Sequence, residues 1–330
     1  MDPAENKKEN LIVLTGPTAA GKSELSVQLA KRIGGEIISA DSMQVYRGMD
    51  IGSAKITVQE MQGVPHHLID VLDPSEPFDV VRFQSLAKEA MRQIRSRGRI
   101  PILVGGTGFY IQAVLYDVDF TRQEQDSDYR RMLEQKADPQ QLHRMLEEAD
   151  PEAARQIHPN NIKRTIRALE YYRETGRRIS EHNEAERAKE SPYRFAYFVL
   201  HEDREVLYDR INRRVDRMME EGLEEEVRLL KERGMTRDMV SMQGIGYAEM
   251  LQYLDGEIPL EEALRLIRRN TRHFAKRQLT WFRRERDVTW IDRGHFNGDN
   301  DRILDEMLRV LSERDILRQG YIKEKDMQEI

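Results

Sequence analysis

The sequence predicts an α/β fold in which a parallel β-sheet carries helices on both faces and a block of helices interrupts the sheet. Four short apolar segments, each typical of a buried strand, alternate with helical stretches: residues 11–15, 36–40, 100–104 and 195–200. A glycine-rich loop follows the first of these segments. Between about residues 116 and 191 the strand signal disappears, and the chain is polar and helix-prone.

The first apolar segment ends in a phosphate-binding motif, G-x-x-x-x-G-K-[ST]. A helical apolar period begins directly after it, at Glu24. The motif glycines let the backbone turn so that consecutive N–H groups face one anion, and the helix start adds its positive dipole end. The lysine adds a point charge and the serine a hydroxyl suited to Mg²⁺. We therefore predict that a di- or triphosphate binds to Gly16, Pro17, Thr18, Ala19, Ala20, Gly21, Lys22 and Ser23.

Two further strand ends carry candidate functional residues, because ligands of α/β sheets bind at the carboxyl edge. Asp41 directly follows the second strand, and we favour a catalytic or Mg²⁺-linked role for it over that of a turn or N-cap aspartate. The third strand runs into Gly105, Gly106, Thr107 and Gly108, which either admit a ligand close to the backbone or form a tight connection. A motor ATPase would show an apolar strand ending in an acid that holds Mg²⁺, but the strand at 100–104 runs into glycine and the short segment at 67–70, which ends in Asp70, is a poor substitute; this disfavours the motor class.

The later chain is predicted to be mostly helical. Helices are expected over residues 81–97, 203–233 and 260–284, with a short apolar piece at 288–291. Between Arg265 and Arg286 there are nine Lys or Arg residues and one acid, Glu285. One side of this helix is an apolar stripe expected in the core. The other side is a basic stripe for which phosphate-backbone contact is favoured over a solvated face: Arg265, Arg269, Arg272 and Lys276.

The domain organisation follows from these segments. We predict a first part of the core over residues 8–120, a helical insertion over 121–192, a second part of the core with basic helices over 193–315, and a tail over 316–330. Pro139, Pro151 and Pro159 each lie near an expected helix start in the insertion.

Composition limits the class of protein. The net charge of −6 alone argues weakly against a nucleic-acid partner, but local clustering of charge matters more than the total. The absence of cysteine excludes disulfides, thiolate nucleophiles and cysteine zinc sites. No apolar run approaches a membrane span, and the first ten residues lack the apolar core of a secretion signal. We expect a cytoplasmic monomer with no membrane partner.

Several motifs, taken together and in order, resemble one enzyme family. GPTAAGKS, DSMQVYRGMDIGSAK, GGTGFY, HPNN, RVDRMMEEGLEEEV and KRQLTWFRR are similar to the bacterial tRNA dimethylallyltransferases, also called tRNA isopentenyltransferases, from about residue 10 to about residue 312. The resemblance implies a P-loop nucleoside-triphosphate-hydrolase/kinase-like core and an insertion that grips the tRNA anticodon stem-loop. It implies transfer of a dimethylallyl group from dimethylallyl diphosphate to N6 of the adenosine just 3′ of the anticodon. The products are N6-isopentenyladenosine and diphosphate.

The resemblance also assigns roles to residues. The phosphate loop would hold the donor's diphosphate without ATP, with Mg²⁺ near Ser23 and with Asp41 as a candidate second ligand of that ion. Asp41 would be the general base, Thr107 would assist binding, and Arg210 matches an arginine that contacts the diphosphate. Residues 41–44 would line a pocket for the extruded base. Positions matching family contacts to tRNA are Asp41, Ser42, Met43, Gln44, Thr107, Arg130, Lys163, Arg164, Thr165, Ile166 and Arg167.

Three other functions remain open from the sequence. A small-molecule kinase that uses ATP shares the loop, the core and Mg²⁺, but has little need of two separated basic groups. A prenyltransferase acting on free AMP would have little use for the inserted helices. A non-enzymatic RNA-binding protein would leave the phosphate loop and Asp41 unexplained.

Overall fold

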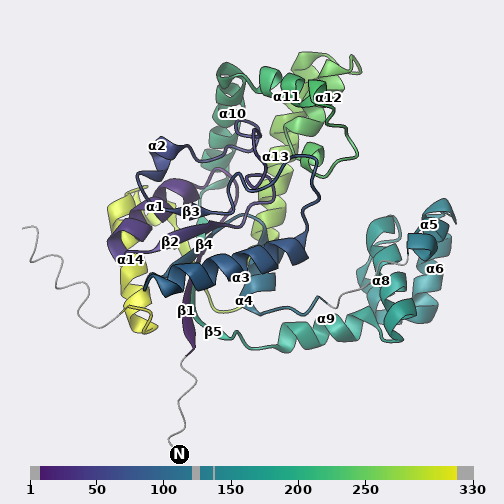
Figure 1. Cartoon of the computed structure of the whole chain (residues 1–330), viewed down its shortest axis with the longest axis horizontal. Coiled ribbons are helices and arrows are strands. Elements are labelled where there is room, and N and C mark those ends of the chain that lie inside the picture. Colours follow the sequence, from purple (N-terminus) through teal and green to yellow (C-terminus); the bar gives the residue numbers. More distant parts are fainter. Residues whose placement is uncertain (1–7, 121–126, 137, 318–330) are drawn as a thin grey trace, which may run out of the picture. The chain divides into compact units, whose positions relative to one another are not determined.

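The computed structural model describes residues 8–120, 127–136 and 138–317. The chain divides into two compact units, one formed by Met1–Leu115 with Pro192–Ile330 and the other by Tyr116–Ser191 (Figure 1). The tail predicted over 316–330 lies outside the described residues from 318 onward. Within the described ranges, no helix combines the length and apolar character that crossing a membrane requires.

A parallel sheet forms the centre of the first unit, as predicted. In the described residues it has six strands in the order β3-β2-β4-β1-β5-β6. They are β1 Glu9–Thr15, β2 Glu36–Ser39, β3 His66–His67, β4 Pro101–Gly105, β5 Tyr193–His201 and β6 Val288–Asp292. The sequence predicted β1, β2, β4 and β5. It missed β3, a two-residue edge strand of histidines without an apolar signal.

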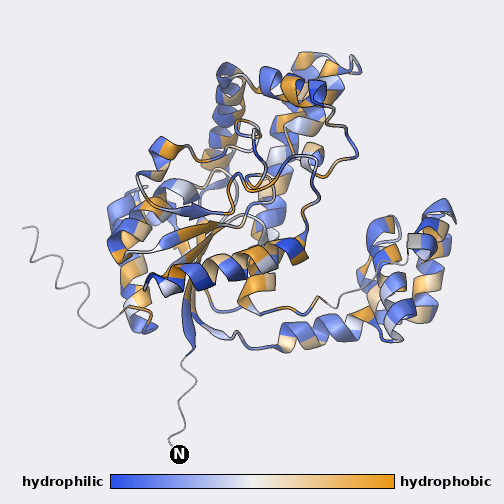
Figure 2. Ribbon diagram, in the orientation of Figure 1, coloured by the Kyte–Doolittle hydropathy of each residue, from blue (hydrophilic) through white to orange (hydrophobic). Residues whose placement is uncertain are grey.

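Both faces of the sheet are covered by helices. Side chains such as Ile12, Leu14 and Phe198 share one buried cluster with residues of α1 (Lys22–Ile33) and α14 (Asn300–Glu313). On the opposite face, α3 (Val80–Ser96) contacts β2 and β4, and α4 (Gly108–Leu115) contacts β4 and α3 (Figure 1). Burial on both faces explains why the strands are nearly continuous apolar runs (Figure 2).

The helices between β5 and β6 pack against one another within the same unit. The predicted helix over 203–233 is in fact two helices, α10 (Arg204–Glu221) and α11 (Leu223–Glu232), because Gly222 adopts a left-handed conformation with φ of 102°. Three short helices are α2 (Val58–Met61), η1 (Ser241–Gln243) and η2 (Arg293–Phe296). The 23-residue helix α13 (Leu260–Phe282) contacts α10 and α12 (Tyr247–Leu254).

The second unit is helical throughout its described part. Its helices are α5 Ser127–Lys136, α6 Pro139–Ala149, α7 Pro151–Gln156, α8 Ile162–Thr175 and α9 Ile179–Ala188. Pro139 and Pro151 begin α6 and α7, as their lack of an N–H favours. The buried Asp150 caps α7 and also accepts bonds from the backbone and hydroxyl of Ser180, which joins α7 to α9.

Candidate active site

The phosphate-binding motif forms a tight loop between β1 and α1. Gly16, Ala19 and Gly21 all have positive φ, at 147°, 65° and 84°. The Nζ atom of Lys22 donates to the carbonyl oxygens of Gly16 at 3.0 Å and Pro17 at 2.8 Å, so the lysine is folded back over the loop. Helix α1 begins at Lys22 without a side-chain cap, which leaves its leading N–H groups to face a ligand.

Lys22 is held in an environment that disfavours its charge. Burial, and then the neighbouring guanidinium of Arg214, lower the pKa of Lys22 to about 7, while the carboxylate of Asp41 acts in the opposite direction. An anionic ligand in the loop would favour the charged form of Lys22 again, because opposite charges attract most strongly where water is excluded.

Arg214 and Gln278 complete the surroundings of the loop, and neither was predicted from the sequence to belong to the site. Arg214 of α10 donates from Nη1 to the hydroxyl of Thr18 at 3.2 Å. The buried Gln278 of α13 accepts the Thr18 N–H at 2.9 Å and donates to the carbonyl of Gly106 at 2.9 Å. Gln278 thereby joins the phosphate loop to the glycine-rich turn after β4. Arg214 lies one helical turn after Arg210, and this spacing is the signal that would have found it.

Asp41 begins the segment that follows β2. Its Oδ1 atom accepts the N–H groups of Met43 at 2.8 Å and Gln44 at 3.4 Å, so Asp41 does shape a turn. Its Oδ2 atom accepts no hydrogen bond from the described part of the chain and remains available for a ligand. The charge of Asp41 acts on both Lys22 and Arg214, which places the carboxylate beside the phosphate loop.

Thr107 lies directly beside the end of β2. Its backbone N–H donates to the carbonyl of Ala40 at 3.3 Å, so the turn after β4 and Asp41 are held together. The glycines of this turn are required by protein contacts. A Cβ on Gly105 would lie 2.1 Å from the oxygen of Ala40, and one on Gly108 would lie 2.3 Å from Trp281. The tight-connection alternative therefore accounts for these glycines.

Arg210 is paired inside the protein. Its Nη2 atom lies 3.0 Å from the buried carboxylate of Glu202, which also lies 3.7 Å from Nε of Arg293. The guanidinium of Arg293 packs against Gly21 of the phosphate loop. The role in diphosphate binding assigned to Arg210 stays a prediction.

The donors expected for Mg²⁺ are oxygen atoms, as that ion prefers. Ser23 has an exposed side chain at the start of α1, and Asp41 offers Oδ2. Among the residues that the structure describes, no group of three or more His, Asp or Glu side chains is arranged to hold a metal. This donor set fits Mg²⁺ bound through one or two protein oxygens, with ligand phosphates supplying others.

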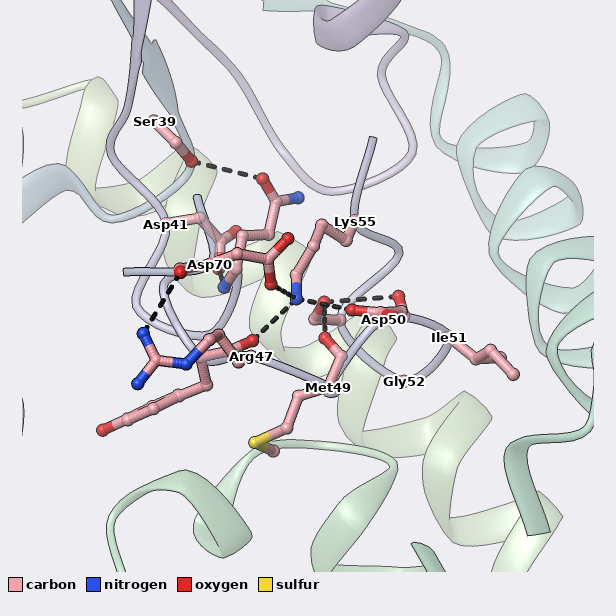
Figure 3. Close-up of polar contacts among 12 residues, drawn as sticks. Ser39, Asp41, Arg47, Met49, Asp50, Ile51, Gly52, Lys55 and Asp70 are labelled. Atoms are coloured by element: carbon pink, nitrogen blue, oxygen red, sulfur yellow. Dashed lines mark hydrogen bonds and ion pairs between the residues drawn. The ribbon is translucent and has the colours of Figure 1, made fainter. Parts of the chain in front are cut away.

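The 41–55 segment is folded around a buried lysine. Nζ of Lys55 donates to the carbonyl of Tyr46 at 2.6 Å and to carboxylate oxygens of Asp50 at 2.6 Å and Asp70 at 2.5 Å (Figure 3). The side chain of Lys55 is only 5% exposed. Gln44 donates from Nε2 to the carbonyl of Ala54 at 3.3 Å, so both ends of the segment are connected.

The residues matched to tRNA contacts in the insertion fall into two groups. Lys163, Arg164 and Arg167 are exposed along α8, whereas Thr165 and Ile166 are buried in the core of the helical unit. The side chains of Thr165 and Ile166 therefore pack within the helical unit, and the role in tRNA binding expected for this set stays a prediction. Arg130 lies 3.2 Å from the buried carboxylate of Glu170 and is part of the packing between α5 and α8.

Two residues of the basic stripe of α13 contact neighbouring side chains, one of which is an acid. Arg265 pairs with Glu262 at 2.6 Å, and Arg272 donates to Asn212 at 2.8 Å. Glu262 lies one turn before the basic stretch that begins at Arg265, so the charge balance of residues 265–286 does not include this acid. Arg269 and Lys276 remain exposed on this helix.

The fold and the loop define the class: an α/β phosphate-binding protein of the P-loop type, with the loop between β1 and α1 at the carboxyl edge of a parallel sheet. A sequence profile described as IPP transferase matches residues 44–285, and one described as isopentenyl transferase matches residues 9–72. The chain belongs to the IPP transferase family.

Relatives are similar over nearly their whole length. A protein of Lachnoclostridium phytofermentans named tRNA dimethylallyltransferase is 58% identical over 311 residues, which is 93% of this chain and 99% of that protein. One of the same name from Halalkalibacterium halodurans is 54% identical over 288 residues, 86% of this chain and 91% of that protein.

Two solved structures have the same fold. The full-length tRNA isopentenylpyrophosphate transferase of Bacillus halodurans has a TM-score of 0.71 at 50% identity, covering 93% of this chain and 98% of that one. A eukaryotic dimethylallyltransferase acting on tRNA has a TM-score of 0.75 at 33% identity, covering 86% of this chain and 74% of that one.

Proposed function

We propose that this protein transfers a dimethylallyl group from dimethylallyl diphosphate to N6 of the adenosine 3′-adjacent to the anticodon of tRNA. Family membership and the names of its relatives support the reaction. The observation that carries the proposal is that the phosphate loop lies beside Asp41. The turn after β4 is bonded to the chain next to Asp41 through Thr107, and to the phosphate loop through Gln278.

The donor's diphosphate would lie in the phosphate loop. Negative charge develops on the diphosphate as the carbon–oxygen bond breaks, and fixed dipoles and cations stabilise such charge effectively. The N–H groups at the start of α1, Lys22 and Arg214 are the groups of this chain that would do so. Mg²⁺ held by Ser23 would neutralise further phosphate charge when bound, and Oδ2 of Asp41 is then kept for the proton of N6.

Asp41 would accept the proton that N6 loses as the new carbon–nitrogen bond forms. The exocyclic amine is a weak nucleophile, because its lone pair is delocalised into the purine ring. Oδ1 of Asp41 is engaged by the turn, so Oδ2 is the atom in a position to act as the base. Ser42, Met43 and Gln44 would line the pocket for a base extruded from the anticodon loop.

The RNA would be held through its backbone by basic residues. Lys163, Arg164 and Arg167 form an exposed cationic group on the helical unit, and contacts of this kind make binding fall steeply with salt. A cytoplasmic location accords with a tRNA substrate.

The test separates transfer chemistry from ATP chemistry. Purified protein is incubated with Mg²⁺, unmodified tRNA and dimethylallyl diphosphate, and the digested tRNA is searched by mass for prenylated adenosine. A parallel incubation with ATP follows release or transfer of the γ-phosphate. Prenyl transfer supports the proposal, whereas phosphate transfer without prenyl transfer would mean that the protein is a kinase.

Two aspartate variants test the base. Asp41→Asn keeps an oxygen for the turn but removes its basicity, so we expect a loss of about 10²- to 10⁴-fold in the rate of transfer. Asp79→Asn is the matched control, because Asp79 also accepts a backbone N–H, from Arg82 at 2.8 Å, but only caps α3. Equal activities of the two variants would remove Asp41 from the chemistry.

A further inference from the structure

Glu226 is a carboxylate of α11 on which four hydrogen bonds converge. Oε2 accepts the backbone N–H groups of Asp50 and Ile51, both at 2.7 Å. Oε1 accepts the N–H of Gly52 at 3.0 Å and the hydroxyl of Tyr247 at 2.7 Å. Three successive amides of one segment are thus bound by a single side chain more than 170 residues away in the sequence.

The bound segment carries Asp41 at its other end. Lys55 bonds both to the carboxylate of Asp50 and to the carbonyl of Tyr46, and Gln44 donates to the carbonyl of Ala54, so hydrogen bonds join residues 50–55 to residues 44–46. The bond between Lys55 and Asp50 is drawn in Figure 3. The three amides and their carboxylate are therefore connected to the turn that Asp41 shapes.

The same helices contact the segment at a second place. The ring of Tyr247 is fully buried against Gly52, where a Cβ would lie 2.6 Å from the ring. Met43, one of the predicted pocket residues, packs against Gly244 just before α12. Burial and the carboxylate of Glu226 raise the pKa of Tyr247, so its hydroxyl remains a donor to that carboxylate.

We propose that Glu226 is a positioning residue that, with Tyr247, holds the 41–55 segment in the conformation needed for transfer to the acceptor base. This inference rests on the proposed function, because the acceptor base is the group that the segment would receive. Glu226 itself lies behind the backbone of residues 50–52 and would touch neither the donor nor the base. Its loss should lower turnover on tRNA while the donor's diphosphate still binds to the intact phosphate loop.

Three variants distinguish positioning from general stability. Glu226→Gln keeps the shape but replaces one of the two oxygens, each of which accepts two hydrogen bonds, by an amide nitrogen that cannot accept. Glu226→Ala removes every contact, and Tyr247→Phe removes only the hydroxyl donor. Glu225→Gln is the matched control, because Glu225 is an exposed neighbour on α11 that pairs only at the surface, with Arg228 at 3.4 Å.

The first readout is amide hydrogen exchange, which does not depend on activity. In Glu226→Ala the amides of Asp50, Ile51 and Gly52 should all exchange about 10- to 100-fold faster than in Glu225→Gln, as expected for loss of charge-assisted bonds, whereas Glu226→Gln should affect only those amides whose acceptor oxygen is replaced. Unchanged exchange at these amides would overturn the proposal whether or not the wild type transfers a prenyl group.

The second readout is kinetic. We expect kcat on tRNA to fall about 10- to 100-fold in Glu226→Ala, less in Glu226→Gln and least in Tyr247→Phe, with the Kd for dimethylallyl diphosphate changed by less than about twofold. A parallel loss of donor binding and thermal stability would mean that Glu226 only supports the fold. Absence of transfer by the wild type would instead refute the proposed function and leave the exchange result to decide the role of Glu226.

Discussion

The lowered pKa of Lys22 predicts that donor binding takes up a proton. In the free protein Lys22 has a pKa of about 7, compared with 10.5 for an ordinary lysine. A diphosphate in the loop favours the charged ammonium and raises that pKa again. Because the pKa of Lys22 is lower in the free protein than in the complex, the affinity for the diphosphate should be greatest below pH 7 and should fall as the pH rises above 7.

The magnitude follows from the fraction of Lys22 that is charged before binding. With a pKa of about 7, roughly 9% is charged at pH 8 and about 1% at pH 9. The affinity for dimethylallyl diphosphate should therefore fall about tenfold between pH 8 and pH 9, with uptake of about 0.9 proton at pH 8. The ligand contributes little to this slope, because the second pKa of a phosphate group is near 6.

Titration calorimetry in two buffers of different ionisation enthalpy measures both quantities without tRNA. Lys22→Arg should remove the slope, because a guanidinium remains charged across this range. If wild-type affinity is constant from pH 7.5 to 9, or if Lys22→Arg shows the same slope, the reasoning about Lys22 is wrong.

Three further predictions concern the phosphate loop, the helical unit and the core of the sheet in turn. Gln278→Leu removes both bonds between the phosphate loop and the turn at Gly106, so donor affinity should fall about tenfold in the same calorimetric assay, with little change in the melting temperature. Alanine at Lys163, Arg164 and Arg167 together should reduce the slope of log K against log salt for tRNA by about 2 to 3, with unchanged donor binding; an unaltered slope would exclude these residues from the RNA surface. Leu14→Ala, in the fully buried central strand, should lower the free energy of unfolding by about 2–5 kcal/mol in urea denaturation, and a loss below 1 kcal/mol would contradict the packing described for β1.

The sequence predicted those strands and helices whose burial is visible in the pattern of apolar residues along the chain. Buried parallel strands must be apolar on both faces, so β1, β2, β4 and β5 were visible as apolar runs. The two-residue strand β3 buries too little to leave such a signal. The break at Gly222 was missed because a glycine inside a long helical period is often tolerated, and only its left-handed φ ends α10.

The candidate site was predictable only where its residues are neighbours in the sequence. The loop over residues 16–23 and the Asp41 turn are each local, and both could be recognised from spacing. Arg214, Gln278 and Glu226 act on loops that lie 172 to 260 residues away along the chain. Their partners in those loops are backbone N–H and carbonyl groups or the hydroxyl of Thr18, and backbone groups occur at every position, so no residue pattern marks the pairing.

The distant contacts have one physical feature in common. In each of them a polar side chain on a helix after β5 fixes a loop at the carboxyl edge of the sheet: Gln278 and Arg214 fix Thr18, and Glu226 fixes residues 50–52. A loop of positive-φ residues around a partly buried lysine is costly to order. Bonds from rigid helices reduce that cost before a ligand binds, so the catalytic groups need less rearrangement when it does. The helices therefore contribute to the site through geometry, in addition to any contact with RNA.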